Sequence, residues 1–136
     1  MNSSIQYLLD TNIISDLVRN PHGIIRDRIA YVGEEKVCTS IIVTSELHFG
    51  VEKKGSLRLR NQLESILSAI LILPFEEPTD RQYAVLRSNL EKAGTPIGPN
   101  DMLIAAQAMN HGLTLVTGNI REFSQTQGPA VENWLQ

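Results

Sequence analysis

Three acidic residues stand where apolar segments give way to helical patterns: Asp10, Glu46 and Asp101. Carboxylates crowded into one site repel one another, and a cation between them relieves that repulsion. Oxygen ligands in that number suit Mg²⁺ or Mn²⁺. Such ions polarise a phosphoryl group and generate a hydroxide nucleophile from water. The three acids therefore predict a metal site for phosphodiester hydrolysis.

Each acid also has a purely structural interpretation. Asp10 would cap a helix that begins near Asn12, and Asp101 would complete the N-terminal cap of a later helix. Glu46 would be an ion-paired acid of the core. The joint occurrence of the three acids at strand-to-helix junctions favours the metal site over three unrelated structural roles.

The elements that must position these acids follow from the spacing of apolar residues. Apolar runs predict strands at residues 5–9, 37–40, 113–116 and 131–134, and one that ends before Pro74. Helical spacing predicts helices near 13–18, 25–33, 43–53, 59–70, 79–93 and 101–111, the last capped by Asn100. Strands that alternate with helices indicate a parallel sheet with helices on both faces. Ligands bind at the carboxyl ends of such strands, which is where Asp10 falls.

Length and composition fit a single α/β domain over residues 1–136. Apolar residues make up 42% of the chain, enough for a core, and the net charge is −3. A negative net charge argues against a protein that binds nucleic acid through an overall positive charge. Bound cations would nevertheless restore positive potential at a nuclease site. No signal peptide and no run of about 20 apolar residues is present. We therefore expect a soluble, cytoplasmic protein with no membrane contact.

Four segments resemble, in order, the motifs of PIN-domain ribonucleases, and more narrowly of the VapC toxins of bacterial type II toxin–antitoxin pairs. They are residues 8–12 (LLDTN), 44–50 (TSELHFG), 99–106 (PNDMLIAA) and 115–123 (LVTGNIREF). The similarity covers essentially the whole chain. It implies a PIN-like three-layer α/β/α domain with a central, mostly parallel sheet of four to five strands. It also implies an endoribonuclease that uses Mg²⁺, with Mn²⁺ as a substitute.

The resemblance assigns roles to the acids. Asp10, Glu46 and Asp101 are implied as the catalytic, metal-site residues. We expect Asp10 and Asp101 to hold the principal ion and Glu46 to orient a water. The fourth acidic position of the family is open here, because Asn119 stands where many relatives have Asp, and Glu122 follows three residues later. The sequence thus leaves open whether one or two metals bind.

Further residues are candidates for supporting roles. Thr11, Asn12 and Thr117 are predicted to orient the metal ligands, with turn formation and capping as the alternative. The densest basic segment comprises Lys53, Lys54, Arg58 and Arg60. These side chains would follow an RNA backbone, or form the solvated end of a helix.

The resemblance also implies partners. A cognate VapB-type antitoxin would block the site, and the chain would form a homodimer and larger complexes with it. Operator DNA would be contacted only through the antitoxin. The substrate is RNA, and its cleavage would inhibit translation. The low aromatic content (5%) favours a structured RNA such as tRNA over an unstructured strand.

Other readings fit less well. A haloacid dehalogenase phosphatase needs a second Asp where this chain has Asn12, and a receiver domain needs a late Lys, whereas none follows Lys92. A catalytically degenerate PIN domain that only binds protein or RNA remains as an alternative, and Asn119 favours it.

Overall fold

A single parallel sheet organises the chain. The computed structural model describes residues 4–124 and 128–136. The strands, in the spatial order β3-β2-β1-β4-β5, are all parallel to their neighbours. They are β1 (Tyr7–Leu9), β2 (Val37–Ser40), β3 (Leu71–Leu73), β4 (Thr114–Val116) and β5 (Val131–Glu132). The expected α/β architecture with a mostly parallel sheet of four to five strands is confirmed, and the sheet has five strands.

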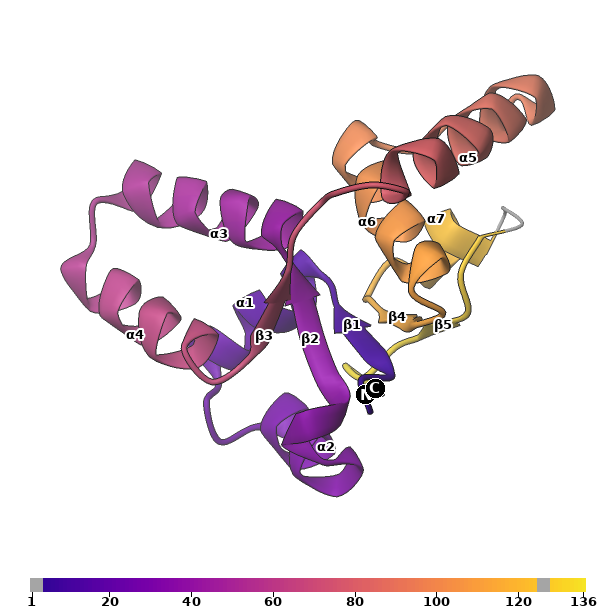
Figure 1. Cartoon of the computed structure of the whole chain (residues 1–136). Helices are drawn as coiled ribbons and strands as arrows, with labels where there is room; N and C mark the ends of the chain where they lie inside the picture. The colour runs from indigo at the N-terminus through magenta and orange to yellow at the C-terminus, as the bar shows by residue number, and fades with distance from the viewer. Residues whose placement is uncertain (1–3, 125–127) are drawn as a thin grey trace.

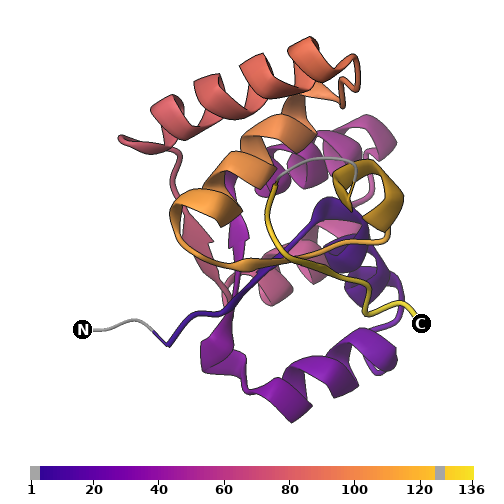
Figure 2. The ribbon, with the colours of Figure 1, turned by 90° about the vertical axis from the view of Figure 1, so that its right-hand side faces the viewer.

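Helices cover both faces of the sheet. They are α1 (Thr11–Arg19), α2 (Ile24–Val32), α3 (Ile41–Lys54), α4 (Leu57–Leu67), α5 (Thr79–Ala93), α6 (Pro99–Asn110) and α7 (Ile120–Ser124), with a short 3₁₀ turn, η1 (Glu34–Lys36). In Figure 1, α1, α3 and α4 gather on one side of the sheet, and α5 with α6 on the other. Figure 2 shows α5 and α6 at the top and α2 at the bottom, with the sheet between them.

The direction of winding changes between β1 and β4. From β1 the chain passes through α1 and α2 to β2, and through α3 and α4 to β3. It then returns through α5 and α6 to β4, on the opposite side of β1. Right-handed crossovers place the helices of the two halves on opposite faces. The carboxyl ends of β1 and β4 therefore form a topological switch point, the usual ligand site of such sheets.

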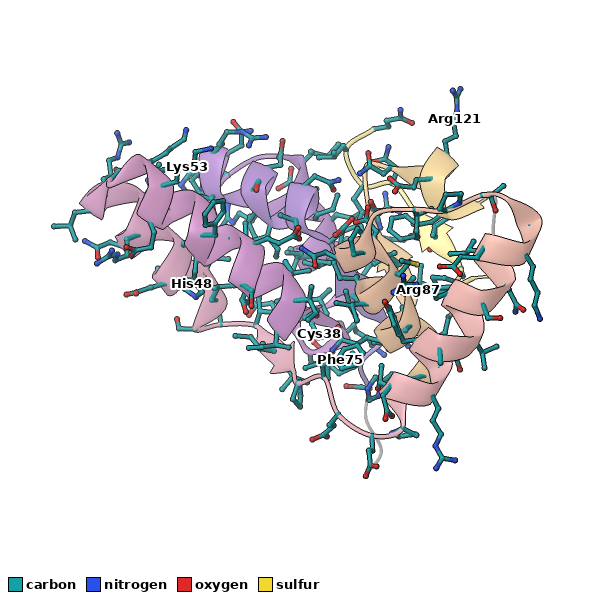
Figure 3. All side chains as sticks on the ribbon, turned by 90° about the horizontal axis from the view of Figure 1, so that it is seen from above. Cys38, His48, Lys53, Phe75, Arg87 and Arg121 are labelled. Atoms are coloured by element: carbon teal, nitrogen blue, oxygen red, sulfur yellow. The ribbon has the colours of Figure 1, made fainter. Side chains whose placement is uncertain are left out.

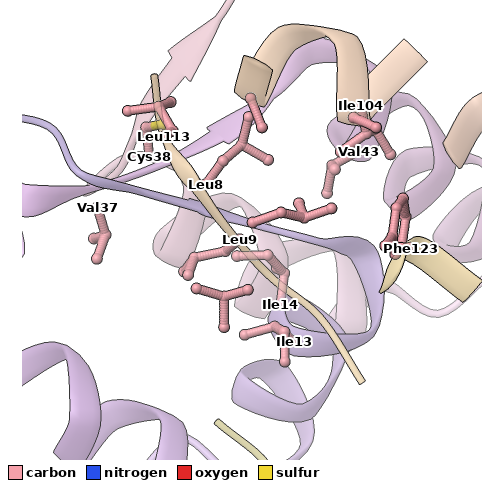
Figure 4. Packing of buried hydrophobic residues seen from close by; sticks show 14 of the residues in the cluster. Leu8, Leu9, Ile13, Ile14, Val37, Cys38, Val43, Ile104, Leu113 and Phe123 are labelled. Atoms are coloured by element: carbon pink, nitrogen blue, oxygen red, sulfur yellow. The ribbon is translucent and has the colours of Figure 1, made fainter. Parts of the chain in front are cut away.

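The core explains why the strands are almost wholly apolar. Leu8, Leu9 and Cys38 are fully buried, as is Leu115 in β4, because helices cover both faces of these central strands. Figure 4 shows Leu8 and Leu9 packed with the neighbouring helix residues Ile13 and Ile14. A rigid central sheet of this kind holds the ends of β1 and β4 in a fixed relation.

Two helices begin directly at the end of a strand. Asp10 follows β1 and caps α1 by accepting a hydrogen bond from the Thr11 amide. Ser40, the last residue of β2, caps α3 by accepting from the Ile42 amide. No loop residues intervene, so the orientation of α1 and α3 relative to the sheet is set by the junctions themselves.

Some sequence expectations require correction. Asn100 does not cap the helix that carries Asp101, since α6 begins one residue earlier, at Pro99, with Gly98 as its cap. The fixed φ of proline suits the first position of a helix. Earlier in the chain, α4 ends at Leu67 rather than at residue 70, and near the carboxyl end of the chain α7 was not expected. No helix among the described residues is both long and apolar enough to cross a membrane.

Candidate active site

Asp10 is the buried centre of the site. Its side chain lies at the carboxyl end of β1 and the residue is only 2% exposed. One carboxylate oxygen accepts from the Thr11 amide at 2.7 Å, and the other from the Thr117 hydroxyl at 2.8 Å. Burial raises the pKa of Asp10, these two hydrogen bonds act against the rise, and the charges of Glu46 and Glu122 add to it. The sheet thus holds a carboxyl group in fixed orientation where its charge is costly.

Glu46 reaches the same place from α3. Its Oε1 accepts a hydrogen bond from the Thr11 hydroxyl at 2.6 Å. Its Oε2 accepts from the Asn100 side-chain amide at 3.1 Å. These two bonds connect α3 with the beginnings of α1 and α6. The Asn100 side chain, expected to cap a helix, instead orients Glu46, and no feature of the local sequence would have indicated this long-range contact.

Asp101 lies in the first turn of α6 and is paired with Glu122. The pKa of Asp101 is raised to about 7. Burial is the largest cause, and the hydrogen bond with Glu122 and the charges of Glu122, Asp10 and Glu46 add to it. Glu122 also accepts from the Gly98 amide at 3.3 Å. The structure therefore places Glu122 beside the predicted acids rather than on an unrelated surface.

The chain after β4 supports Asp10. Thr117 is fully buried, donates to Asp10, and accepts a hydrogen bond from the Asn119 amide at 3.0 Å. The Asn12 side-chain oxygen accepts from the Gly118 amide at 3.0 Å, which ties α1 to this turn. Thr117 thus orients the acid directly, whereas Asn12 acts through the backbone.

The acids face a common cleft of about 420 Å³. It is lined by Asp10, Thr11, Asn12, Ser15, Arg19, Glu46, Asp101 and Asn119. Asn119 therefore borders the cleft, while Glu122 contacts Asp101 from α7. The sequence expectations did not include Ser15 or Arg19. Their regular spacing of four residues from Thr11 along a helix is the signal that would have identified them.

Comparison with known proteins agrees with this geometry. Residues 7–129 match the PIN domain. The chain is 33% identical to the tRNA(fMet)-specific endonuclease VapC of Shigella flexneri, over 96% of this chain and 98% of that protein. It is 36% identical to ribonuclease VapC2 of Haemophilus influenzae, over 96% of this chain and 99% of that protein. The chain belongs to the PIN-domain family.

Solved structures support the same assignment. The VapBC2 complex of Rickettsia felis bound to a promoter DNA fragment matches with a TM-score of 0.88 and 33% identity, covering 96% of this chain and 99% of that chain. FitAcB of Neisseria gonorrhoeae matches with a TM-score of 0.84 and 34% identity, covering 96% and 99%. This PIN domain is of the VapC type, and its enzyme class is that of an endoribonuclease.

PIN-domain nucleases of the VapC type generally depend on a divalent metal ion. Among the described residues, no three Asp, Glu, His or Cys side chains cluster closely enough to hold an ion alone. The donors that line the cleft nevertheless fit a hard cation, because they are carboxylate, amide and hydroxyl oxygens without sulfur or imidazole. Mg²⁺ is usually held by one or two carboxylates, with water and substrate phosphates filling the other positions. A complete protein cage is therefore not required.

Only Lys54 of the predicted basic segment lines a hollow next to the acids of this PIN domain. Lys54 lines a groove of about 270 Å³ that adjoins the cleft, while Arg60 forms an ion pair with Glu52. Lys53 and Arg58 are exposed, and neither lines the cleft. Figure 3 shows Lys53 on the same helix as His48. In the same view, Arg121 on α7 extends outward from the molecule. Of the four predicted RNA contacts, Lys54 is the one beside the acidic site.

Proposed function

We propose that this protein is the toxin of a type II toxin–antitoxin pair and hydrolyses RNA with Mg²⁺. Mn²⁺ would act as a substitute ion. The observation that carries the proposal is the cleft at the topological switch point, lined by Asp10, Glu46 and Asp101. The match to VapC ribonucleases over nearly the whole chain supports the same reaction.

The roles that we propose follow from the hydrogen bonds. Asp10 and Asp101 would hold the principal ion, and Glu122, hydrogen-bonded to Asp101, is our choice over Asn119 for the fourth position. A bound divalent ion supplies positive charge that polarises the phosphate and lowers the pKa of a water. Thr117 and the Thr11 amide keep the Asp10 oxygens in place.

We assign Glu46 to the attacking water. Its two oxygens are held by Thr11 and Asn100, so the carboxylate is fixed between α1 and α6 at the wall of the cleft. A fixed carboxylate can orient a water in line with the scissile bond and accept its proton. Phosphodiester hydrolysis then needs no histidine, and none lines the cleft among the described residues.

We propose a VapB-type antitoxin as the partner. Two structural neighbours are complexes named VapBC, from Rickettsia felis and Salmonella typhimurium, and both are bound to DNA. The groove beside the cleft offers an apolar surface for such a partner, with Val18, Leu47, Val51, Leu59 and Leu63 among its lining residues. Operator DNA would be contacted through the antitoxin, and the toxin would form a homodimer within larger complexes.

We propose tRNA as the substrate class. Relatives from Shigella flexneri and Salmonella typhimurium, each 33% identical to this chain, are named tRNA(fMet)-specific endonucleases. Cleavage of a tRNA would inhibit translation.

The test is to incubate the purified chain with total RNA in Mg²⁺ and to map the new RNA ends. The proposal predicts discrete ends within tRNA that vanish with a chelator and in the Asp101→Asn variant. The absence of Mg²⁺-dependent ends, together with retained RNA binding, would instead identify a catalytically degenerate binding module.

A further inference from the structure

A polar stripe on α1 leads away from the catalytic acids. Thr11, Ser15 and Arg19 are four residues apart, so they lie on one face of the helix. All three line both the cleft and the adjoining groove. The stripe begins at the Thr11 hydroxyl, which donates to Glu46. It ends at Arg19, roughly 12 Å farther along the helix axis at 1.5 Å per residue.

Arg19 brings the positive charge to this surface. It is the one basic residue among those described as lining the cleft. Its side chain is 64% exposed, and its ion pair with Asp16 has a long N–O distance of 3.9 Å. Exposed pairs of this kind contribute little energy. Most of the guanidinium donors therefore face solvent at the rim of the cleft, available to an anion.

The substrate requires such a charge. RNA carries one negative charge per phosphate, and the cleft walls carry carboxylates. An ion held by the acids neutralises the phosphate that is cleaved but not its neighbours. The guanidinium group matches a phosphate with two parallel hydrogen bonds, which a lysine ammonium does not reproduce. A neighbouring phosphate that follows the α1 stripe would meet the Ser15 hydroxyl and then Arg19.

We propose that Ser15 and Arg19 form a phosphate-binding subsite for the RNA strand. Arg19 holds the phosphate that neighbours the scissile one, and Ser15 donates a hydrogen bond to the same strand. The inference rests on the proposed ribonuclease function and deepens it. Both residues bind and position the substrate, and neither takes part in bond cleavage.

Two other roles for Arg19 make different predictions. A cation in the last turn of α1 complements the helix dipole, which would make the residue a stabiliser of the fold. An acidic side chain of the antitoxin would also pair with it. The first role predicts a lower melting temperature on substitution, and the second predicts weaker antitoxin binding with unchanged RNA binding.

The test compares Arg19→Gln and Arg19→Lys with the unchanged chain, using the RNA that the chain cleaves. Loss of a charged hydrogen-bond pair is expected to raise KM roughly tenfold, with kcat changed by no more than about twofold. The slope of log(1/KM) against log salt concentration should become shallower by about 0.7, the value of one single-stranded phosphate contact. Arg19→Lys should recover part of the loss, and Ser15→Ala should raise KM less.

The matched control is Arg87→Gln. Arg87 is an exposed arginine on α5, bonded to Glu91 and Tyr83, and it does not line the cleft. It should leave KM and the salt slope unchanged. Unchanged KM and slope in Arg19→Gln would overturn the proposal, as would a fall in melting temperature that accounts for the whole loss, or an effect confined to the antitoxin complex.

A binding measurement separates this inference from the proposed activity. Fluorescence anisotropy of a short labelled RNA oligonucleotide, with Mg²⁺ and in an Asp10→Asn background, requires no cleavage. Weaker binding on adding Arg19→Gln supports the subsite even if the chain proves catalytically inactive. Equal binding with and without that substitution overturns the subsite even if the chain cleaves RNA.

Discussion

Asp10 and Asp101 lie where burial and neighbouring acids disfavour the ionised form of their carboxyl groups. Asp10 is buried beside Glu46 and Glu122, and burial together with the neighbouring Glu122 raises the pKa of Asp101. A fold that keeps such groups together does so at a cost in stability, which a bound cation offsets by binding only the native state. At the scale of residues, the site is therefore distinguished by carboxyl groups that destabilise one another's charged forms.

Replacement of Asp101 by Asn should stabilise the metal-free protein at alkaline pH. The pKa of Asp101 is raised from 3.8 to about 7 in the folded protein. For a raised pKa, the contribution to stability is fully present below the unfolded value and is lost as pH rises through the folded value. Thermal unfolding in chelator should show Asp101→Asn melting above the wild type at pH 8 and near it below pH 4.

The control is Glu64→Gln, which removes an exposed acid of α4 away from the cleft. Equal melting temperatures of wild type and Asp101→Asn at pH 8 would contradict the crowding of acids described above.

Thr117 should matter to both the fold and the metal. Thr117→Val removes the hydroxyl that donates to Asp10 and accepts from the Asn119 amide. The buried Asp10 carboxylate loses its hydroxyl donor and the Asn119 amide loses its acceptor, which should lower the free energy of unfolding by about 1–3 kcal/mol. Mg²⁺ affinity should fall about tenfold or more, since outer partners orient ligands. Chemical denaturation and titration calorimetry measure these quantities, and unaltered values of both would remove Thr117 from the site.

At the scale of elements, the sequence predicted those strand and helix bounds that depend on neighbouring residues. The bounds of β2 and α5 were predicted from apolar runs and helix-ending signals such as Gly94. Asn100 was assigned to the wrong role, because the same side chain can cap a helix or bond to Glu46, 54 residues away. Glu122 was ambiguous for the same reason: its partners, Gly98 and Asp101, are distant in sequence.

Gly50 is a helix position of α3 at which alanine should stabilise the protein. It lies inside this helix with no positive φ, and a Cβ placed there would meet nothing within 4 Å. Gly50→Ala should therefore raise the free energy of unfolding by up to about 1 kcal/mol, because alanine loses less backbone entropy on folding. Gly94→Ala is the control: its φ of 72° is left-handed, so the substitution should destabilise the protein. Stabilisation by both, or by neither, would contradict this description.

At the scale of the whole molecule, topology brings the site together. The order β3-β2-β1-β4-β5 places the ends of β1 and β4 side by side, although 107 residues separate Asp10 from Thr117. The sequence could predict that acids follow strands, and the strand-end rule then predicts convergence. It could not predict which oxygens pair with which donors, since those contacts depend on side-chain packing across four elements.

The most direct test of the central claim is RNA cleavage by Asp10→Asn at saturating Mg²⁺. Asparagine can still cap α1 by accepting from the Thr11 amide, so the melting temperature and circular dichroism spectrum should show an intact fold. We expect the cleavage rate to fall by more than about a hundredfold, because the substitution removes the negative charge that we propose holds the ion. Cleavage at the wild-type rate by this folded variant would contradict the assignment of Asp10 and of the cleft as the active site.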